Sequence, residues 1–339
     1  SLQGITQILA EGNFIDATTD DFQFPFGSGF APQNAHPRWI DDYIESDRSG
    51  YFANHFMVKM LGRVDATGDA PEGNHYQLLS DNVQYGVEDP RIRFYFRRQL
   101  TYERPGDSNI PCVFNNVDCN YYYPGLGYLG RDRGDNSVGP ADIPISTKWG
   151  AYPAGGVIDN LVADGTNRNE SPLNRSVGTG QGILPMLTNY MAKFIRAEAA
   201  LTLGTGEDAR ELLESGVRAS VQKVQAFGRS ISEVSPEVDP LITPTDTYVS
   251  AVMTKYDAAD EAGKLEIIID QAYIANFGNS VESYNNFRRT GYPVLQEVVD
   301  DNEVGPFPLR LVYVVDEIGA NANIPQDNNA TKPVFWDIN

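Results

Sequence analysis

The chain has 339 residues, of which 41% are hydrophobic, and this content supports a large buried core rather than a disordered chain. Its 26 basic and 46 acidic residues give a net charge of −20. Such a surface repels phosphate backbones and anionic lipid headgroups, which argues against nucleic-acid binding. No run approaches the roughly 18 apolar residues of a membrane helix.

The first part of the chain mixes short helical patterns with loops. Residues 1–12 read as the end of a helix, and residues 16–44, rich in Phe, Gly, Pro and Asp, predict an ordered loop packed by aromatic side chains. Residues 51–61 have helical spacing, with Gly62 as the stop. A further helix is predicted from Pro90 over the sequence PRIRFYFRRQ.

The two cysteines, Cys112 and Cys119, lie seven positions apart between prolines. A disulfide here would close a short loop and stabilise the fold by about 2 to 3 kcal/mol, and two free thiols are the alternative. His36, His55 and His75 are isolated from each other and from further cysteines. The sequence therefore predicts no zinc site, and we assign no metal ligands and no cofactor. A cation site at Asp132, Asp135 and Asn136 is chemically possible, but Arg/Asp pairs that lock this loop are the favoured explanation.

Residues 103–182 have little helical periodicity and many Gly, Pro, Asn and Asp residues. Ordered loops of this length commonly build binding sites, and flat aromatic faces next to polar groups suit the apolar faces of sugar rings. The alternative is that these aromatic residues only pack the loops together. The predicted ligand contacts are Trp39, Tyr121, Tyr122, Tyr128, Arg131, Trp149 and Tyr152.

After residue 182 the pattern becomes helical. Two successive stripes of apolar residues at helical spacing predict two helices. Small residues between these stripes would let the helices approach closely, as in the hairpins of tetratricopeptide repeats. Thr205 with Asp208 is typical of a capping box that opens the second helix, and another helix begins at Thr245. The two stripes consist of Leu187, Tyr190, Met191, Phe194 and Ile195, then of Ala209, Leu212, Leu213, Gly216, Val217, Ser220, Val221 and Val224.

The stretch from Lys264 to Tyr292 carries another apolar helical stripe that Gly278 ends. A second short helix is expected to bury Val281, Tyr284 and Phe287. The run LRLVYVV that follows Pro308 predicts a short strand or an extended segment that fills the core, and Trp336 is a predicted core anchor.

This C-terminal region resembles the SusD/RagB-like nutrient-binding lipoproteins of Bacteroidetes. The resemblance rests on Gln271, Ile274, Ala275 and Glu282, on FRRTGYP from Phe287 to Pro293, on PLRLVYVVDEIGANAN from Pro308 to Asn323, and on FWDIN at the end. It implies a mainly α fold, with a tetratricopeptide-like scaffold carrying a loop-rich ligand face. We expect a loop-rich region over 1–182, the helical scaffold over 183–290 and a wrapping tail over 291–339.

The resemblance also implies a function. Family members sit on the extracellular face of the outer membrane through an N-terminal lipid anchor, and they capture glycans, or in some members peptides, for a SusC-like TonB-dependent transporter. The anchor and the helices that normally follow it are not in this sequence, so we expect a truncated or processed chain, with a naturally short homologue as the alternative.

An enzyme is the competing reading. Acidic neighbours such as Asp20 with Asp21 or Asp41 with Asp42 do not meet the need of a glycosidase for two carboxylates facing each other across a cleft. The sequence has no GxSxG, HExxH or phosphate-loop motif. We therefore predict a binding protein without chemistry of its own, with a helical glycoside hydrolase or a structural helical adaptor as alternatives.

Overall fold

The structure is a computed structural model that describes residues 2–29, 33–44, 52–62, 81–99, 128, 130, 146–162, 177–295, 307–321, 323 and 330–334. Within these residues the fold is mostly helical, as predicted. The helices are α1 (Leu2–Glu11), α2 (Pro37–Trp39), α3 (Asn54–Leu61), α4 (Ile92–Tyr95), α6 (Asn189–Leu203), α7 (Ala209–Ile231), α8 (Thr245–Ala258), α9 (Glu261–Ala275), α10 (Ser280–Thr290) and α12 (Val315–Ala320). Short 3₁₀ helices are η1 (Thr18–Asp20), η4 (Asp81–Val83) and η6 (Asp239–Leu241), and η2 (Ile40–Ile44) is a π-helix. The strands are β1 (Phe22–Pro25), β2 (Phe96–Arg97), β3 (Lys148–Trp149) and β4 (Ile183–Leu187).

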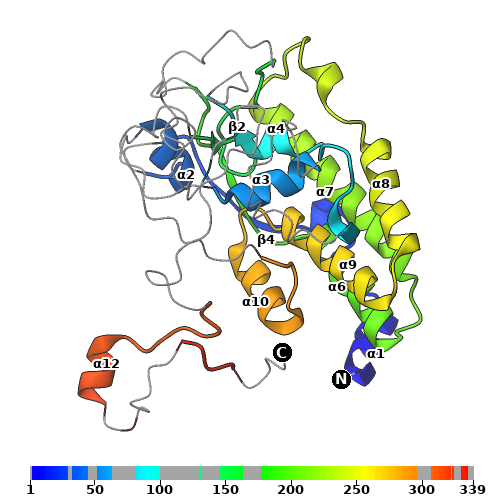
Figure 1. Ribbon diagram of the computed structural model, residues 1–339. Coiled ribbons are helices and arrows are strands. Elements are labelled where there is room, and N and C mark those ends of the chain that lie inside the picture. The colour runs from blue at the N-terminus through cyan, green and yellow to red at the C-terminus, as the bar shows by residue number, and fades with distance from the viewer. Residues whose placement is uncertain are drawn as a thin grey trace, which may run out of the picture.

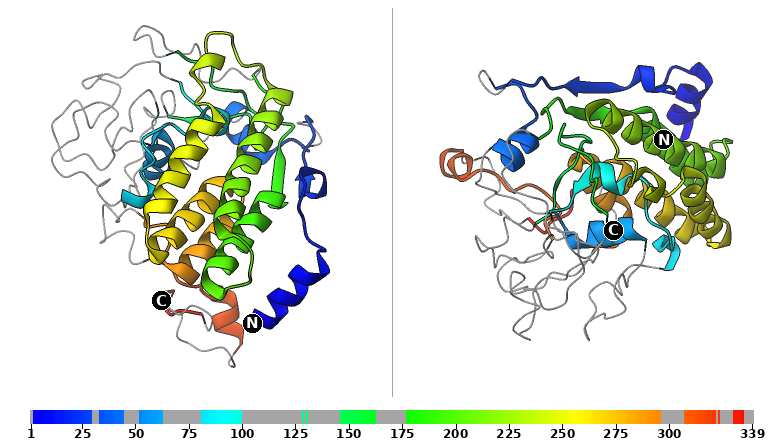
Figure 2. Two further views of the ribbon diagram at one scale, coloured as in Figure 1. Left: turned by 90° about the vertical axis from the view of Figure 1, so that its right-hand side faces the viewer. Right: turned by 90° about the horizontal axis from the view of Figure 1, so that it is seen from above.

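Helices α6, α7, α8 and α9 lie side by side and form the scaffold (Figures 1 and 2). The predicted small residues do allow close approach, because a Cβ added at Gly216 of α7 would lie 3.0 Å from the Phe194 ring of α6. The main apolar core lies between these helices and includes Tyr190, Phe194, Leu213, Val217, Val221, Tyr248, Val252 and Ile268. The tetratricopeptide-like helical pairs are therefore present as expected.

Helix ends follow the local chemistry of the chain. Gly204 ends α6 in a left-handed conformation at φ 65°, which glycine adopts without steric cost. The predicted capping box at Thr205 is wrong, since the N-cap of α7 is Asp208, whose Oδ1 accepts from the amides of Arg210 (2.9 Å) and Glu211 (3.1 Å). Gly62 ends α3 as predicted, at φ 69°.

Two small antiparallel sheets join segments that are distant in sequence. The helix expected from Pro90 ends at Tyr95, because Phe96 and Arg97 pair instead with Trp149 and Lys148. In the other sheet β1 pairs with β4. Local periodicity cannot show such pairing between distant segments. The prediction of one helix over PRIRFYFRRQ is therefore wrong after Tyr95.

The segments after α9 bury less than predicted. Val281 of α10 is 64% exposed rather than buried. The run after Pro308 is neither strand nor core, because Leu311, Val314 and Val315 are 88%, 70% and 80% exposed, and α12 stands away from the scaffold in Figure 1. Trp336 lies outside the described residues.

A buried arginine joins the N-terminal half to three scaffold helices. The Arg91 guanidinium donates to both oxygens of Asp89, at 2.9 and 2.6 Å, and to Ser220 Oγ of α7 at 2.9 Å. It also lies 3.3 Å from Gln271 Oε1 of α9 and 3.5 Å from the Tyr248 hydroxyl of α8. The side chains of Arg91 and Asp89 have no exposed surface, so each charge depends on these partners.

We predict that Arg91→Met destabilises the fold by about 3 to 5 kcal/mol, because it leaves the Asp89 carboxylate buried without its counter-ion. The matched control is Arg210→Met, which breaks an Arg–Asp pair with Asp257 whose side chains are 46% and 50% exposed. Arg210→Met should lower the free energy of unfolding by less than about 1 kcal/mol, because exposed ion pairs contribute little. Urea denaturation of both variants measures the difference, and equal losses would contradict the role given to Arg91.

Candidate functional site

The backbone of Trp149 is held on both of its polar atoms by one short segment. Its amide donates to Asp42 Oδ2 at 2.7 Å, and its carbonyl accepts from the Tyr43 hydroxyl at 2.7 Å. Both partners belong to η2, which follows directly on α2. Since β3 also pairs with β2, the backbone of Trp149 is held from two sides.

The Trp149 ring is half-buried and lies beside a half-buried phenylalanine and an exposed arginine. Its centroid lies 5.0 Å from that of Phe52, and the Arg38 guanidinium carbon lies 6.0 Å from the Trp149 ring. On the inner side the ring packs against Phe277, at 4.8 Å. We call Trp149, Phe52 and Arg38 the Trp149 shelf.

The Trp149 shelf combines the two groups that a sugar ring requires. An aromatic face covers the apolar C–H face of a pyranose, and a guanidinium can donate several hydrogen bonds to hydroxyls. The Arg38 side chain is 52% exposed, and Asp41 holds it at 3.4 Å. The arrangement is suited to binding, and it presents no pair of facing carboxylates.

Three of the predicted ligand residues lie in the core. The exposed fractions are 6% for Trp39, 1% for Tyr128 and 0% for Tyr152. Trp39 stacks on Tyr43 at 6.4 Å, and the Tyr152 hydroxyl lies 3.1 Å from that of Tyr190. We therefore assign these three rings to packing, since a buried ring offers no face to a ligand.

Of the other four predicted ligand contacts, one lies within the described residues and three lie outside them. Trp149 is the predicted residue with a partly exposed ring among the described residues. Tyr121, Tyr122 and Arg131 lie outside the described residues, as does the predicted disulfide of Cys112 and Cys119. Their roles stay predictions.

Sequence reasoning missed Phe52 and Arg38 as parts of the shelf. Phe52 lies within residues 51–61, whose helical spacing is typical of core residues and gives no sign of a ligand contact. No local signal places residue 38 beside residue 149, because their contact follows from the hydrogen bonds that η2 makes to β3.

The acidic pairs considered for catalysis have structural partners instead. Asp42 accepts from the Trp149 amide, and Asp21 pairs with Lys223 of α7 at 2.5 Å. Within the described residues, no group of three or more His, Cys, Asp and Glu side chains is placed to hold a metal ion.

A neutral histidine caps the short helix that carries Arg38 of the shelf. His36 is the N-cap of α2, and its Nδ1 accepts from the Arg38 amide at 3.1 Å. Burial, with a smaller effect of the Arg38 charge, lowers the pKa of His36 to about 4. Protonation of Nδ1 would remove the acceptor, so the cap requires the neutral ring.

Comparison with known proteins gives a family match and a fold match. A family model described as SusD-like, Susd and RagB outer membrane lipoprotein, matches residues 166–331. Among curated proteins, none matches the chain.

Several solved structures share the fold. A chitin-binding SusD homolog from Flavobacterium johnsoniae superposes with a TM-score of 0.56 at 20% identity, over 96% of this chain and 56% of that one. A SusD homolog from Bacteroides ovatus superposes with a TM-score of 0.56 at 20% identity, over 100% of this chain and 60% of that one. A SusD homolog from Bacteroides fragilis superposes with a TM-score of 0.53 at 18% identity, over 94% of this chain and 56% of that one. The chain thus spans a little more than half the length of each of these three structures.

We predict that acidification weakens the fold through His36. The ring binds a proton in the unfolded chain near the ordinary pKa of about 6.5, but in the folded protein only near pH 4. This contribution to stability is complete above pH 6.5 and is lost as the pH falls toward 4. Between pH 7 and pH 5 it should decrease by about 1 to 2 kcal/mol.

The variant His36→Asn tests this, because asparagine caps a helix without titrating. Urea denaturation at pH 7 and pH 5 should show a smaller decrease in the variant than in the wild-type protein. The pKa of His55 is also lowered by burial, to about 3, so part of the acid sensitivity should remain. An identical decrease in both proteins would contradict the role of His36.

Proposed function

We propose that this chain, which belongs to the SusD-like family of outer-membrane lipoproteins, captures a nutrient glycan on the Trp149 shelf. It does so by binding alone, without chemistry of its own. The helical scaffold supplies a rigid support, and the loop-rich N-terminal half carries the contact residues. The predicted contacts Tyr121, Tyr122 and Arg131 belong to the same proposal.

The observation that carries the proposal is the position of Trp149. Its ring is partly exposed beside an exposed arginine, while both polar atoms of its backbone are fixed by η2. A ligand therefore meets an aromatic face that is already in place, which lowers the entropy cost of binding. Chitin oligosaccharides are the first glycans to test, because one protein of the same fold is named as chitin-binding.

We place this activity at the outer membrane, as part of the same proposal. The family description names outer-membrane lipoproteins. Among the described residues, no helix is both long and apolar enough to cross a bilayer. A lipid anchor in a longer form of the protein would hold the chain at the extracellular face, where a SusC-like TonB-dependent transporter would receive the glycan.

Replacement of Trp149 by alanine should weaken glycan binding about tenfold, because a stacked aromatic face contributes about 1.5 kcal/mol. The substitution keeps the hydrogen bonds to Asp42 and Tyr43, since these use the backbone of residue 149. Calorimetric titration with chitin, xylan and glucan oligosaccharides and with short peptides measures the effect. Circular dichroism confirms that the variant is folded.

Phe22→Ala is the matched control, because Phe22 is 60% exposed on β1 and is not part of the shelf. It should bind as the wild-type protein does. Unchanged affinity in Trp149→Ala would contradict the shelf as the site. Binding of peptides alone would assign the protein to a peptide-binding role, and release of sugars would assign it to glycoside hydrolysis.

A further inference from the structure

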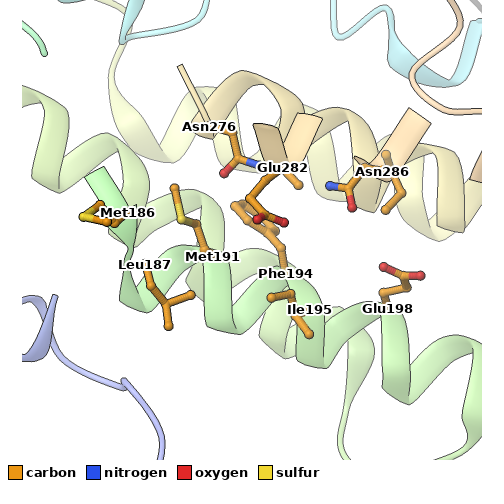
Figure 3. Close-up of a pocket in the computed structure, with 11 residues that line it drawn as sticks. Met186, Leu187, Met191, Phe194, Ile195, Glu198, Asn276, Glu282 and Asn286 are labelled. Carbon is orange, nitrogen blue, oxygen red and sulfur yellow. The ribbon is translucent and has the colours of Figure 1, made fainter. Parts of the chain in front are cut away.

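A second candidate site lies between β4, α6, α9 and α10. It is a pocket of about 230 Å³, and we call it the α6/α10 pocket. Figure 3 shows methionine and aliphatic side chains along one side, which ends at the carboxylate of Glu198, and the polar groups of Asn276, Glu282 and Asn286 along the other. Its apolar lining consists of Met186, Leu187, Met191, Phe194, Ile195, Ile269 and Ala272.

The rim of this pocket exposes apolar side chains that the helical pattern predicts to be buried. Ile195 of α6 and Leu187 at the end of β4 are 60% and 42% exposed, although both belong to the apolar stripe predicted over residues 187–195. The floor, in contrast, is closed by Met191 and Phe194, at 4% and 2%. The pocket therefore combines exposed apolar side chains with buried ones.

Asn276 brings a buried polar atom without a partner into this apolar pocket. The residue is 5% exposed, and its Oδ1 accepts no hydrogen bond from any of the described residues. Its backbone is fully used at the end of α9, where the amide donates to Ala272 and the carbonyl accepts from Asn279. A buried acceptor left without a hydrogen bond is unfavourable, so a donor that enters the pocket and bonds to it gains binding free energy.

The charge of the pocket is negative. Glu198 forms an ion pair with Arg289, whose guanidinium also donates to Asn286 Oδ1 at 3.0 Å. Glu282 lines the pocket with no ion pair to any residue that the structure describes. Arg288, the other basic residue of α10, donates to the Leu309 carbonyl and is not part of the lining. The carboxylate of Glu282 is therefore the uncompensated charge at this site.

We propose that the α6/α10 pocket binds a primary alkylammonium group. The aliphatic stem lies against Met186, Met191 and Ile195, and the ammonium donates to Asn276 Oδ1 while Glu282 supplies the opposite charge. The pocket is smaller than the roughly 300 to 1,000 Å³ of sites for drug-sized ligands, so it fits one aliphatic chain rather than an oligosaccharide. The ammonium group belongs either to a free alkylamine or to a lysine side chain.

This site is independent of the proposed glycan capture. None of its lining residues belongs to the Trp149 shelf, and its chemistry selects a cation rather than a hydroxylated ring. Failure of one proposal therefore leaves the other intact.

Calorimetric titration with pentylamine, 1-pentanol and pentanoate tests the proposal on the whole chain. Pentylamine should bind at least tenfold more tightly than the neutral alcohol, and pentanoate should not bind. Equal binding of amine and alcohol would overturn the proposal, because it would show that the charge and the hydrogen-bond donors of the head contribute nothing.

The variant Asn276→Leu removes the unpaired acceptor with little change of shape. Leucine adopts the φ of −77° and ψ of 13° found at this position without strain. We expect pentylamine affinity to fall at least tenfold while the melting temperature stays equal or rises, because a buried unsatisfied atom has been removed. A lower melting temperature, or unchanged affinity, would assign Asn276 to structure and overturn the proposal.

A charge-matched pair of variants completes the test. Glu282→Gln should lower pentylamine affinity several-fold. Glu237 is an exposed glutamate after α7 that is not part of the pocket, so Glu237→Gln should leave the affinity unchanged.

Titration with Nα-acetyl-lysine N-methylamide then distinguishes a lysine side chain from a free alkylamine as the source of the ammonium group. Tighter binding of this compound than of pentylamine assigns a protein side chain, tighter binding of pentylamine assigns a free amine, and binding of neither overturns the proposal.

Discussion

The buried ion pair of Arg91 and Asp89 is the constraint on which the rest of this fold depends. Both charges lie in the interior, so they are stable only while hydroxyl and amide groups of α7, α8 and α9 surround them. Because Arg91 directly precedes α4, this requirement fixes α4 and β2 against the scaffold. The helices thereby hold α4 and β2 in place.

That fixed position reaches the candidate site through a short series of contacts. Strand β2 pairs with β3, and β3 carries Trp149. The segment η2 then holds Trp149 from the other side through Asp42 and Tyr43, and His36 caps the helix that leads into it. Most of the aromatic residues in this region are buried, and their packing leaves the Trp149 ring partly open beside Arg38. Binding specificity would therefore come from a few side chains on a well-supported backbone.

The sequence predicts the helices well where their stability is local. Gly62 and Gly204 end helices because only the left-handed conformation continues the chain there, and the apolar stripe of α7 is buried as its spacing indicates. Prediction fails where long-range contacts decide. The pairing of Phe96 with Trp149, the exposure of Val281 and the burial of Tyr152 each depend on segments distant in sequence. The site was predicted as a region rich in aromatic residues, but which rings face solvent is a property of the assembled core.

The most direct test of glycan capture is an NMR titration that follows the indole N–H signals of Trp149 and Trp39 as chitin oligosaccharide is added. Trp39 is a reference within the same molecule, because its indole is buried and donates to the Val177 carbonyl at 3.2 Å. Glycan capture on the Trp149 shelf predicts that the Trp149 signal shifts with saturation while the Trp39 signal stays in place. A saturable ligand that leaves the Trp149 signal unchanged would contradict it and place the binding site elsewhere on the chain.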